Sequence, residues 1–110
     1  MVIHINSIGS YKPHVREVDD ETIRRSRIVV DSYEHALKEA GDIVIGLERS
    51  IIRKTDIVAE LGELVLGRKH VRTAPDEITF FKSVGLAVQD LAVAQKVLEK
   101  AEHNGVGLVV

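Results

Sequence analysis

Short runs rich in β-branched and aromatic residues alternate with helical patterns along this chain, and that alternation constrains the fold more than any other feature. Strand-like runs occur at residues 2–8, 28–30 and 78–81. Each run is too short for a stable helix, and β-branched side chains favour extended backbone. Because strands that alternate with helices build parallel sheets, we expect an α/β fold with a partial, Rossmann-like parallel sheet and flanking helices.

Three shorter segments are expected to be helical from their caps and spacing. Asp19 and Asp20 suit the start of a helix that runs through Ser26. Either Asp31, with Glu34 as its capping-box partner, or Ser32 caps a second helix that ends at Gly41, placed as a left-handed terminal residue. A third, capped by Thr55 or Asp56, ends near Gly67, and its apolar face is formed by Ile57, Leu61, Leu64 and Val65.

The end of the chain predicts a long helix followed by a strand. From Val84 onward, apolar residues repeat every three or four positions, which predicts a helix of about 20 residues. Asn104 and Gly105 end it, and residues 106–110 are expected to form a terminal strand. Residues 42–52 fit either a buried turn or a helix.

Length and composition restrict the class of protein. A chain of 110 residues holds one domain, and its formal net charge of -2 provides no field to attract nucleic acid. The longest apolar runs, about six residues, are far shorter than the roughly 20 that cross a bilayer. The absence of cysteine excludes disulfides and thiolate metal sites. We therefore expect a single-domain cytoplasmic protein without nucleic-acid or membrane partners.

The loop after the first strand is one candidate binding site. Ligands of open α/β sheets bind beyond the carboxyl ends of the strands, which directs attention to the loops after Ile8, Val30 and Phe81. In the first loop, Gly9 permits close backbone approach, and Ser10 and Tyr11 offer hydroxyl groups. The alternative is that the glycine only makes a turn.

The loop after Phe81 is a second candidate. Ser83 and the amides of residues 82–85 would meet an anion or a polar ring at the start of a helix. The alternative is that Ser83 is simply the N-cap of the long helix.

Other polar groups give weaker indications. Glu60 and Glu63 are more consistent with a solvated helix face than with a catalytic carboxylate pair, and the basic residues at 68–72 suit an exposed loop as well as a phosphate contact. No two histidines share metal-ligand spacing, so no metal site is expected. The five histidines are His4, His14, His35, His70 and His103.

Several blocks of sequence resemble the ornithine cyclodeaminase and mu-crystallin family. Residues 4–19, His-Ile-Asn-Ser-Ile-Gly-Ser-Tyr-Lys-Pro-His-Val-Arg-Glu-Val-Asp, are similar to the family's His-Ile-Asn-Ala-Ile-Gly segment, proline loop and Arg-Glu-Leu-Asp. Further similar blocks follow in the same order, at 29–42, 59–67 and 76–90. The resemblance covers essentially the whole chain.

The resemblance implies a position within a larger enzyme. Family members are roughly three times as long, and this chain resembles only their last third. By that resemblance, residues 1–83 correspond to the later part of an NAD(P)-binding domain. Residues 84–110 correspond to the helix and strand that return to a substrate and dimerisation domain. The Gly-rich phosphate fingerprint and the substrate lysine precede the segment that this chain resembles.

The resemblance also implies cofactor-binding residues for NAD or NADP. The family's first loop, here Ser7, Ile8, Gly9 and Ser10, lies against the nicotinamide side, and Ser83 belongs to its Ser-x-Gly loop near the same ring. Tyr11 stands where cyclodeaminases have a catalytic aspartate, so no catalytic residue is assigned. The loop is closer to that of the mu-crystallin and imine-reductase members, whose shared chemistry is hydride transfer at a carbon–nitrogen centre.

Two functional hypotheses remain open from the sequence. In the first, the chain is the C-terminal portion of an NAD(P)-dependent cyclodeaminase, amino-acid dehydrogenase or imine reductase, inactive alone and completed by an N-terminal chain. The motivating feature is an initiator methionine that abuts a mid-domain strand. In the second, the chain is a non-catalytic module that self-associates as a homo-oligomer through strand edges and the apolar face of the long helix.

Overall fold

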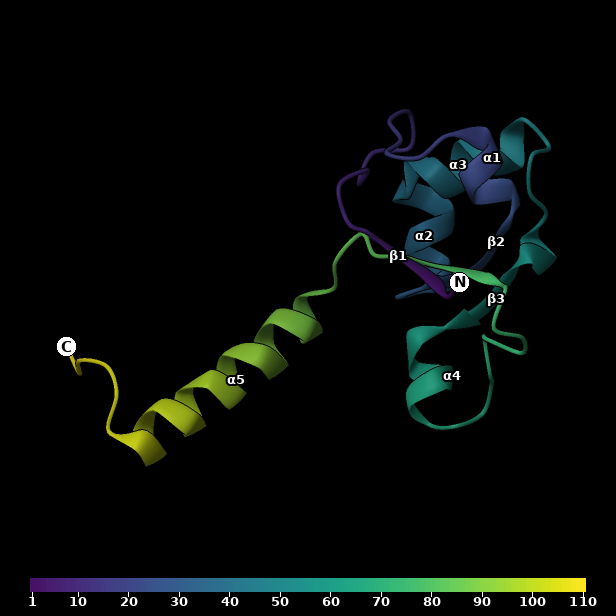
Figure 1. Cartoon of the computed structure of the whole chain (residues 1–110). Helices are drawn as coiled ribbons and strands as arrows, with labels where there is room; N and C mark the ends of the chain where they lie inside the picture. The colour runs from purple at the N-terminus through teal and green to yellow at the C-terminus, as the bar shows by residue number, and fades with distance from the viewer.

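The computed structural model describes all 110 residues and forms an α/β fold around a four-stranded sheet (Figure 1). Every pairing in the sheet is parallel, and the strand order is β1-β4-β2-β3. The predicted parallel α/β sheet is therefore confirmed. The strands are β1 (Ile3–Ser7), β2 (Ser26–Val30), β3 (Ile57–Glu60) and β4 (Ile78–Lys82). The helices are α1 (Asp20–Arg24), α2 (Tyr33–Glu39), α3 (Gly41–Glu48), α4 (Leu61–Val65), α5 (Ala87–Asn104) and a 3-10 turn at Lys54–Asp56.

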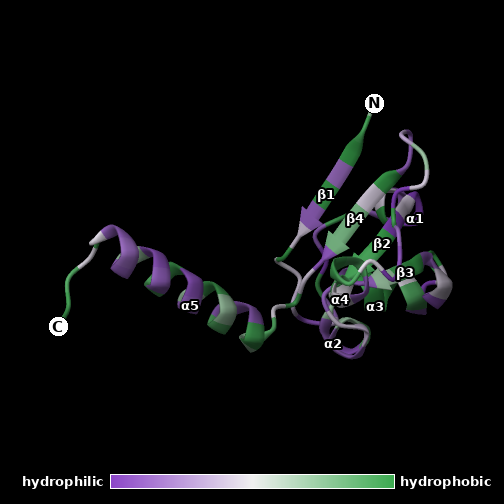
Figure 2. Ribbon diagram, turned by 90° about the horizontal axis from the view of Figure 1, so that it is seen from below, coloured by the Kyte–Doolittle hydropathy of each residue, from purple (hydrophilic) through white to green (hydrophobic).

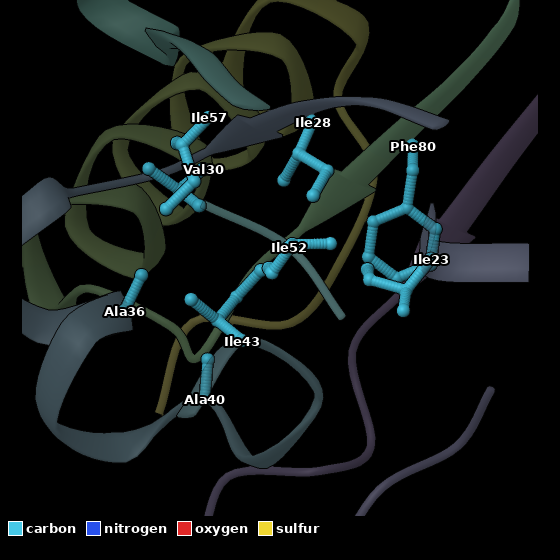
Figure 3. Packing of buried hydrophobic residues seen from close by; sticks show 9 residues of the cluster. All are labelled: Ile23, Ile28, Val30, Ala36, Ala40, Ile43, Ile52, Ile57 and Phe80. Atoms are coloured by element: carbon cyan, nitrogen blue, oxygen red, sulfur yellow. The ribbon is translucent and has the colours of Figure 1, made fainter. Parts of the chain in front are cut away.

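The hydrophobic core lies between one face of the sheet and helices α1, α2 and α3 (Figure 3). Strands β2 and β4 supply its centre through Ile28, Val30 and Phe80, all fully buried. The remaining members of the cluster are Ile23, Ala36, Ala40, Ile43, Ile52 and Ile57. Figure 1 shows α1, α2 and α3 gathered on this side of the sheet and α4 on the other.

The expected helix from residue 55 to 67 is wrong in its first half. Ile57–Glu60 is strand β3, which pairs with β2, and only Leu61–Val65 is helical. Ile57 and Ala59 are buried, and Val58 and Glu60 are half-buried. The four-residue spacing from Ile57 to Leu61 is typical of a helix. Residues 57–60 form a strand instead, because every second residue is buried against the rest of the fold.

The predicted start of α2 is confirmed, whereas its predicted end and that of α1 are wrong. Ser32, the second of the two caps considered, accepts from the backbone N–H of His35, whereas the side chain of Asp31 bonds elsewhere. Gly41 is the first residue of α3 rather than a left-handed end of α2, and this settles 42–52 largely as helix. Ser26, expected at the end of α1, begins β2 because it pairs with Ile78 of β4.

The long C-terminal helix is confirmed, with Gly105 as its left-handed cap. It extends away from the body of the protein and has no buried residue (Figures 1 and 2). The terminal strand expected at 106–110 does not form, since these residues lie beyond the far end of α5 and meet no strand edge. No helix combines the length and apolar character needed to cross a membrane.

Candidate functional site

The carboxyl ends of the four strands lie at one level of the sheet. Ser7 pairs with Lys82, Lys82 with Val30, and Val30 with Glu60. The three loops that the sequence predicted as candidate sites, after Ile8, Val30 and Phe81, therefore emerge side by side, because β4 lies between β1 and β2. This edge is where an open parallel sheet binds its ligands.

Two backbone hydrogen bonds join these loops. The N–H of Ser83 donates to the carbonyl of Ser7 over 3.0 Å, and the N–H of Asp31 donates to the carbonyl of Lys82 over 3.3 Å. The segment at 82–83 consequently connects the loop after β1 to the loop after β2.

A buried lysine stands at the centre of the edge. Lys82 is fully buried, and its Nζ donates to Ser7 Oγ at 2.9 Å and lies 3.1 Å from Asp42 Oδ2. The carboxylate of Glu17 is 3.9 Å away and accepts a hydrogen bond from Ser7 Oγ. A buried charge is tolerable only when paired in this way.

Asp42, near the N-terminus of α3, holds the other end of the loop after β1. It accepts hydrogen bonds from the Ser10 hydroxyl and from the backbone N–H groups of Glu17 and Val18, at 2.9 and 3.0 Å. Burial by itself raises the pKa of Asp42, but these donors and Lys82 outweigh it and hold the pKa below the usual value. Asp42 is therefore a carboxylate that fixes the loop.

Ser83 is held by a second buried carboxylate. Its Oγ donates to Asp31 Oδ2 at 2.7 Å, and the same oxygen accepts from the N–H groups of Val84 and Gly85, both at 3.1 Å. Leu86, not Ser83, is the N-cap of α5. The N-cap alternative for Ser83 is thus wrong, and the loop at 83–85 is shaped by Asp31.

The predicted cofactor-binding residues divide into a buried and an exposed set. Ser7, Ser10 and Ser83 are buried, and their hydroxyls donate to the carboxylates of Glu17, Asp42 and Asp31. The exposed surface of the first loop is provided by Ile8, whose exposed fraction is 75%, and by Gly9. A ligand at this edge would therefore meet Ile8 and backbone rather than the serine hydroxyls.

Tyr11 does not join the buried cluster. Its side chain is 59% exposed, and the Nζ of Lys12 lies 5.6 Å from the centre of its ring. The backbone N–H of Tyr11 donates to the carbonyl of Gly9 at 3.1 Å, which closes the turn after β1.

The carboxylates of Glu60, at the end of β3, and Glu63, in α4, are structural. Glu60 accepts from the N–H of Tyr33 at 2.8 Å, and Glu63 accepts from the Tyr33 hydroxyl at 3.1 Å and from Lys69. Both side chains tie β3 and α4 to α2, so the expectation of a merely solvated face is wrong. The hydrogen bond from the backbone N–H of Glu60 is the largest cause that lowers the pKa of Glu63.

The basic segment at 68–72 is only partly an exposed loop. Arg72 donates to the carbonyls of Glu77 and Ile3 and to Thr79 Oγ1, so this cation supports the start of the sheet rather than a phosphate site. Nowhere in the fold do three or more His, Asp or Glu side chains gather as a set able to hold a metal ion.

Sequence reasoning did not select three residues that shape the edge: Glu17, Asp42 and Lys82. The sequence does contain a signal for Lys82, because it is a single cation that directly continues the strand-like run at 78–81. A lysine that continues a buried strand needs a partner for its charge. Nothing local distinguishes Asp42 from an acidic first-turn residue, since its partners Ser10 and Glu17 lie 32 and 25 residues away in sequence.

Comparison with known proteins finds reductases and dehydrogenases of similar sequence and fold. A Δ1-pyrroline-2-carboxylate reductase from Bacillus cereus is 43% identical over 106 residues, which is 96% of this chain and 33% of the reductase. The Thermococcus litoralis enzyme of the same name, solved with NADH and L-proline, superposes with a TM-score of 0.84 at 48% identity, covering 97% of this chain and 33% of that one. An archaeal alanine dehydrogenase dimer with bound NAD gives a TM-score of 0.78 at 40% identity, covering 97% and 33% of the two chains.

The match to the family as a whole is equally extensive. The chain spans about a third of the length of the relatives it matches, and the resemblance stated from its sequence motifs is confirmed. The family model for the ornithine cyclodeaminase/mu-crystallin family matches residues 2–105. With that match, and with a superposable fold, this chain belongs to the ornithine cyclodeaminase/mu-crystallin family.

Proposed function

We propose that this chain is the C-terminal portion of a cytoplasmic NAD(P)-dependent reductase that acts on carbon–nitrogen double bonds, and that it is inactive alone. In this proposal, residues 1–83 are the later part of the cofactor-binding domain and 84–110 belong to the substrate and dimerisation domain. The observation that carries the proposal is the preformed edge where the loops after β1 and β4 are joined by the Ser83–Ser7 hydrogen bond. Relatives with this fold are solved with NADH or NAD.

The exposed surface of the edge fits one flank of a nicotinamide ring. Ile8 offers an apolar side chain and Gly9 leaves the backbone accessible, which suits a flat ring whose faces are apolar. When bound, the nicotinamide would supply the hydride, while this chain's loops orient the ring and exclude water from one side. Ser7, Ser10 and Ser83 would act by shaping these loops, because their hydroxyls already have partners inside the fold.

The surfaces left uncovered support completion by further polypeptide. Parallel sheets are ordinarily covered on both faces, yet the face opposite α1–α3 carries a pocket of about 350 Å³ lined by Asn6, Val29, Leu61, Leu64 and Phe81. Strand β1 is an edge of the sheet with a free side. The chain covers about a third of its relatives, so a complementary segment would supply the missing cover.

Helix α5 adds a third uncovered surface. Its apolar stripe carries Leu91 and Leu98, with exposed fractions of 67% and 60%, and no residue of the helix is buried. This stripe also favours the second hypothesis, a non-catalytic module that self-associates through α5. Sedimentation distinguishes the two hypotheses, because a homo-oligomer would form without any complementary chain.

A graft tests the proposed function. This chain would replace the matching third of the Thermococcus litoralis reductase, and NADH oxidation with Δ1-pyrroline-2-carboxylate would be followed for the graft and for the isolated chain. We expect turnover by the graft and none by the isolated chain. Robust turnover by the isolated chain would contradict its inactivity, and a folded graft without NADH binding would contradict the role in the cofactor site.

A further inference from the structure

We propose that Lys82 is a positioning residue that holds the loop after β1 in the shape that faces the nicotinamide. The expected effect on cofactor binding rests on the proposed function, whereas the contacts by which Lys82 holds the loop do not depend on any ligand. The observation that carries it is a fully buried lysine whose Nζ lies 2.9 Å from Ser7 Oγ and 3.1 Å from Asp42 Oδ2. We call residues 7–18 the β1 loop.

The β1 loop has little other support from apolar packing. Among residues 8–18 only Ser10 is buried and only Val18 packs, partly buried, against the core, while Ile8, Tyr11 and Val15 are exposed. A loop with so few buried apolar contacts opens readily unless polar contacts hold it. Its order therefore depends on a small number of buried hydrogen bonds.

Besides a backbone bond from the N–H of Gly41 to the carbonyl of Ser10, those hydrogen bonds converge on one ion pair. Lys82 contacts the start of the loop at Ser7, and Asp42 contacts the middle and end of the loop through Ser10, Glu17 and Val18. The Lys82 cation and the Asp42 carboxylate are each other's buried counter-charge. Removing the lysine leaves that carboxylate with an unpaired buried charge, which is strongly unfavourable.

The same residue links the β1 loop to the loop that carries Ser83. The backbone carbonyl of Lys82 accepts from Asp31, and the next residue donates its N–H to the carbonyl of Ser7. Asp31 in turn fixes the loop at 83–85. Lys82 thus connects both loops that the proposed function assigns to the nicotinamide.

Hydrogen exchange on the 110-residue chain tests the positioning role without a cofactor. In Lys82→Met, we expect the amides of Glu17 and Val18, which donate to Asp42, to lose protection by at least about tenfold, while amides of β2 keep theirs. Lys100→Met on α5, an exposed lysine, is the matched control and should change neither. Unchanged protection at Glu17 and Val18 in folded Lys82→Met would overturn the inference.

A double variant separates positioning from general stability. Replacing a buried ion pair with apolar residues often restores stability, so Lys82→Met with Asp42→Leu should regain much of the lost resistance to urea. It should not regain protection at Glu17 and Val18, because the oxygen that binds their N–H groups is gone. A protected β1 loop in this double variant would show that the ion pair does not hold the loop, and it would contradict the inference even where the single variant does not fold.

The graft gives a functional readout. Lys82→Met in the graft should raise the Kd for NADH by about tenfold or more, while Lys100→Met should not. If Lys82→Met in the graft binds NADH as tightly as the parent graft although its β1 loop has lost protection, the link to the cofactor is refuted. The role of Lys82 in holding the loop would then still stand. A graft that binds no NADH even with Lys82 present would instead refute the proposed function.

Discussion

The hydroxyl of Ser83 donates to the carboxylate of Asp31 across 2.7 Å and joins two loops that lie 52 residues apart in sequence. The same carboxylate oxygen also binds the N–H groups of Val84 and Gly85. One buried side chain at the end of β2 therefore determines the path by which the chain leaves β4 for α5.

Asp31→Ala should lower the free energy of unfolding by about 2 to 3 kcal/mol, because the hydroxyl and two N–H groups lose their buried acceptor. Asp31→Asn keeps one oxygen acceptor and should cost less, about 1 kcal/mol. Urea denaturation of both variants measures the difference. Equal losses in the two variants would show that the acceptor oxygen is not what holds the loop.

Gly41→Ala should destabilise the fold by about 1 to 3 kcal/mol. A Cβ at this position would overlap the backbone carbonyl oxygens of Val15 and Lys12, which cannot move without displacing the β1 loop. Gly62→Ala in α4 is the matched control, since nothing lies within 4 Å of its Cβ, and it should stabilise the protein by about 0.5 to 1 kcal/mol. Thermal unfolding followed by circular dichroism should show shifts of opposite sign.

Protonation of Glu77 should make the protein less stable in acid. Hydrogen bonds from the backbone and hydroxyl of Thr73 lead the causes that lower its pKa from 4.5 to about 2. Because the folded-state pKa is the lower one, the stabilisation is complete above about pH 4.5 and is lost as the pH falls toward 2.

An NMR titration of the Glu77 carboxyl carbon measures that pKa directly. Glu77→Gln should flatten the pH dependence of the urea midpoint between about pH 5 and pH 2, the window in which the stabilisation by Glu77 is lost. Glu39→Gln, an exposed carboxylate on α2, should leave it unchanged. A midpoint profile that is the same in Glu77→Gln as in the parent protein would argue against this assignment.

The apolar stripe of α5 should matter for association and not for folding of the chain itself. Leu91→Asp and Leu98→Asp, at exposed positions of a helix without buried residues, should change the free energy of unfolding by less than about 0.5 kcal/mol. Either substitution should weaken binding of a complementary segment or of a second copy, as measured by sedimentation velocity. Ile43→Asp in the core is the contrasting variant and should unfold the protein.

Local patterns were sufficient to predict much of the fold. Alternating apolar residues identified β1, and β-branched runs identified β2 and β4. The three- and four-residue spacing with Asn104–Gly105 bounded α5. These features arise within a few residues of one another, so a short stretch of sequence contains them.

Burial against the sheet decided the elements that local pattern left ambiguous. Residues 57–60 satisfy a helical spacing with Leu61, but pairing with β2 makes them a strand. Residues 106–110 are apolar enough for a strand and form none, because no strand edge is near them. Secondary structure at such segments depends on neighbours supplied by distant parts of the chain.

For the candidate site, the sequence by itself determined which loops would lie together, because parallel strands end at a common edge. It also determined the family, through motifs that run along the whole chain. Only the tertiary structure showed that Ser7, Ser10 and Ser83 are buried supports. Lys82 and Asp42 hold Ser7 and Ser10, and Asp31 holds Ser83. The physical reason is separation in sequence. Lys82 and Ser7 lie 75 residues apart, and only the folded sheet brings the lysine ammonium within hydrogen-bonding distance of the serine hydroxyl.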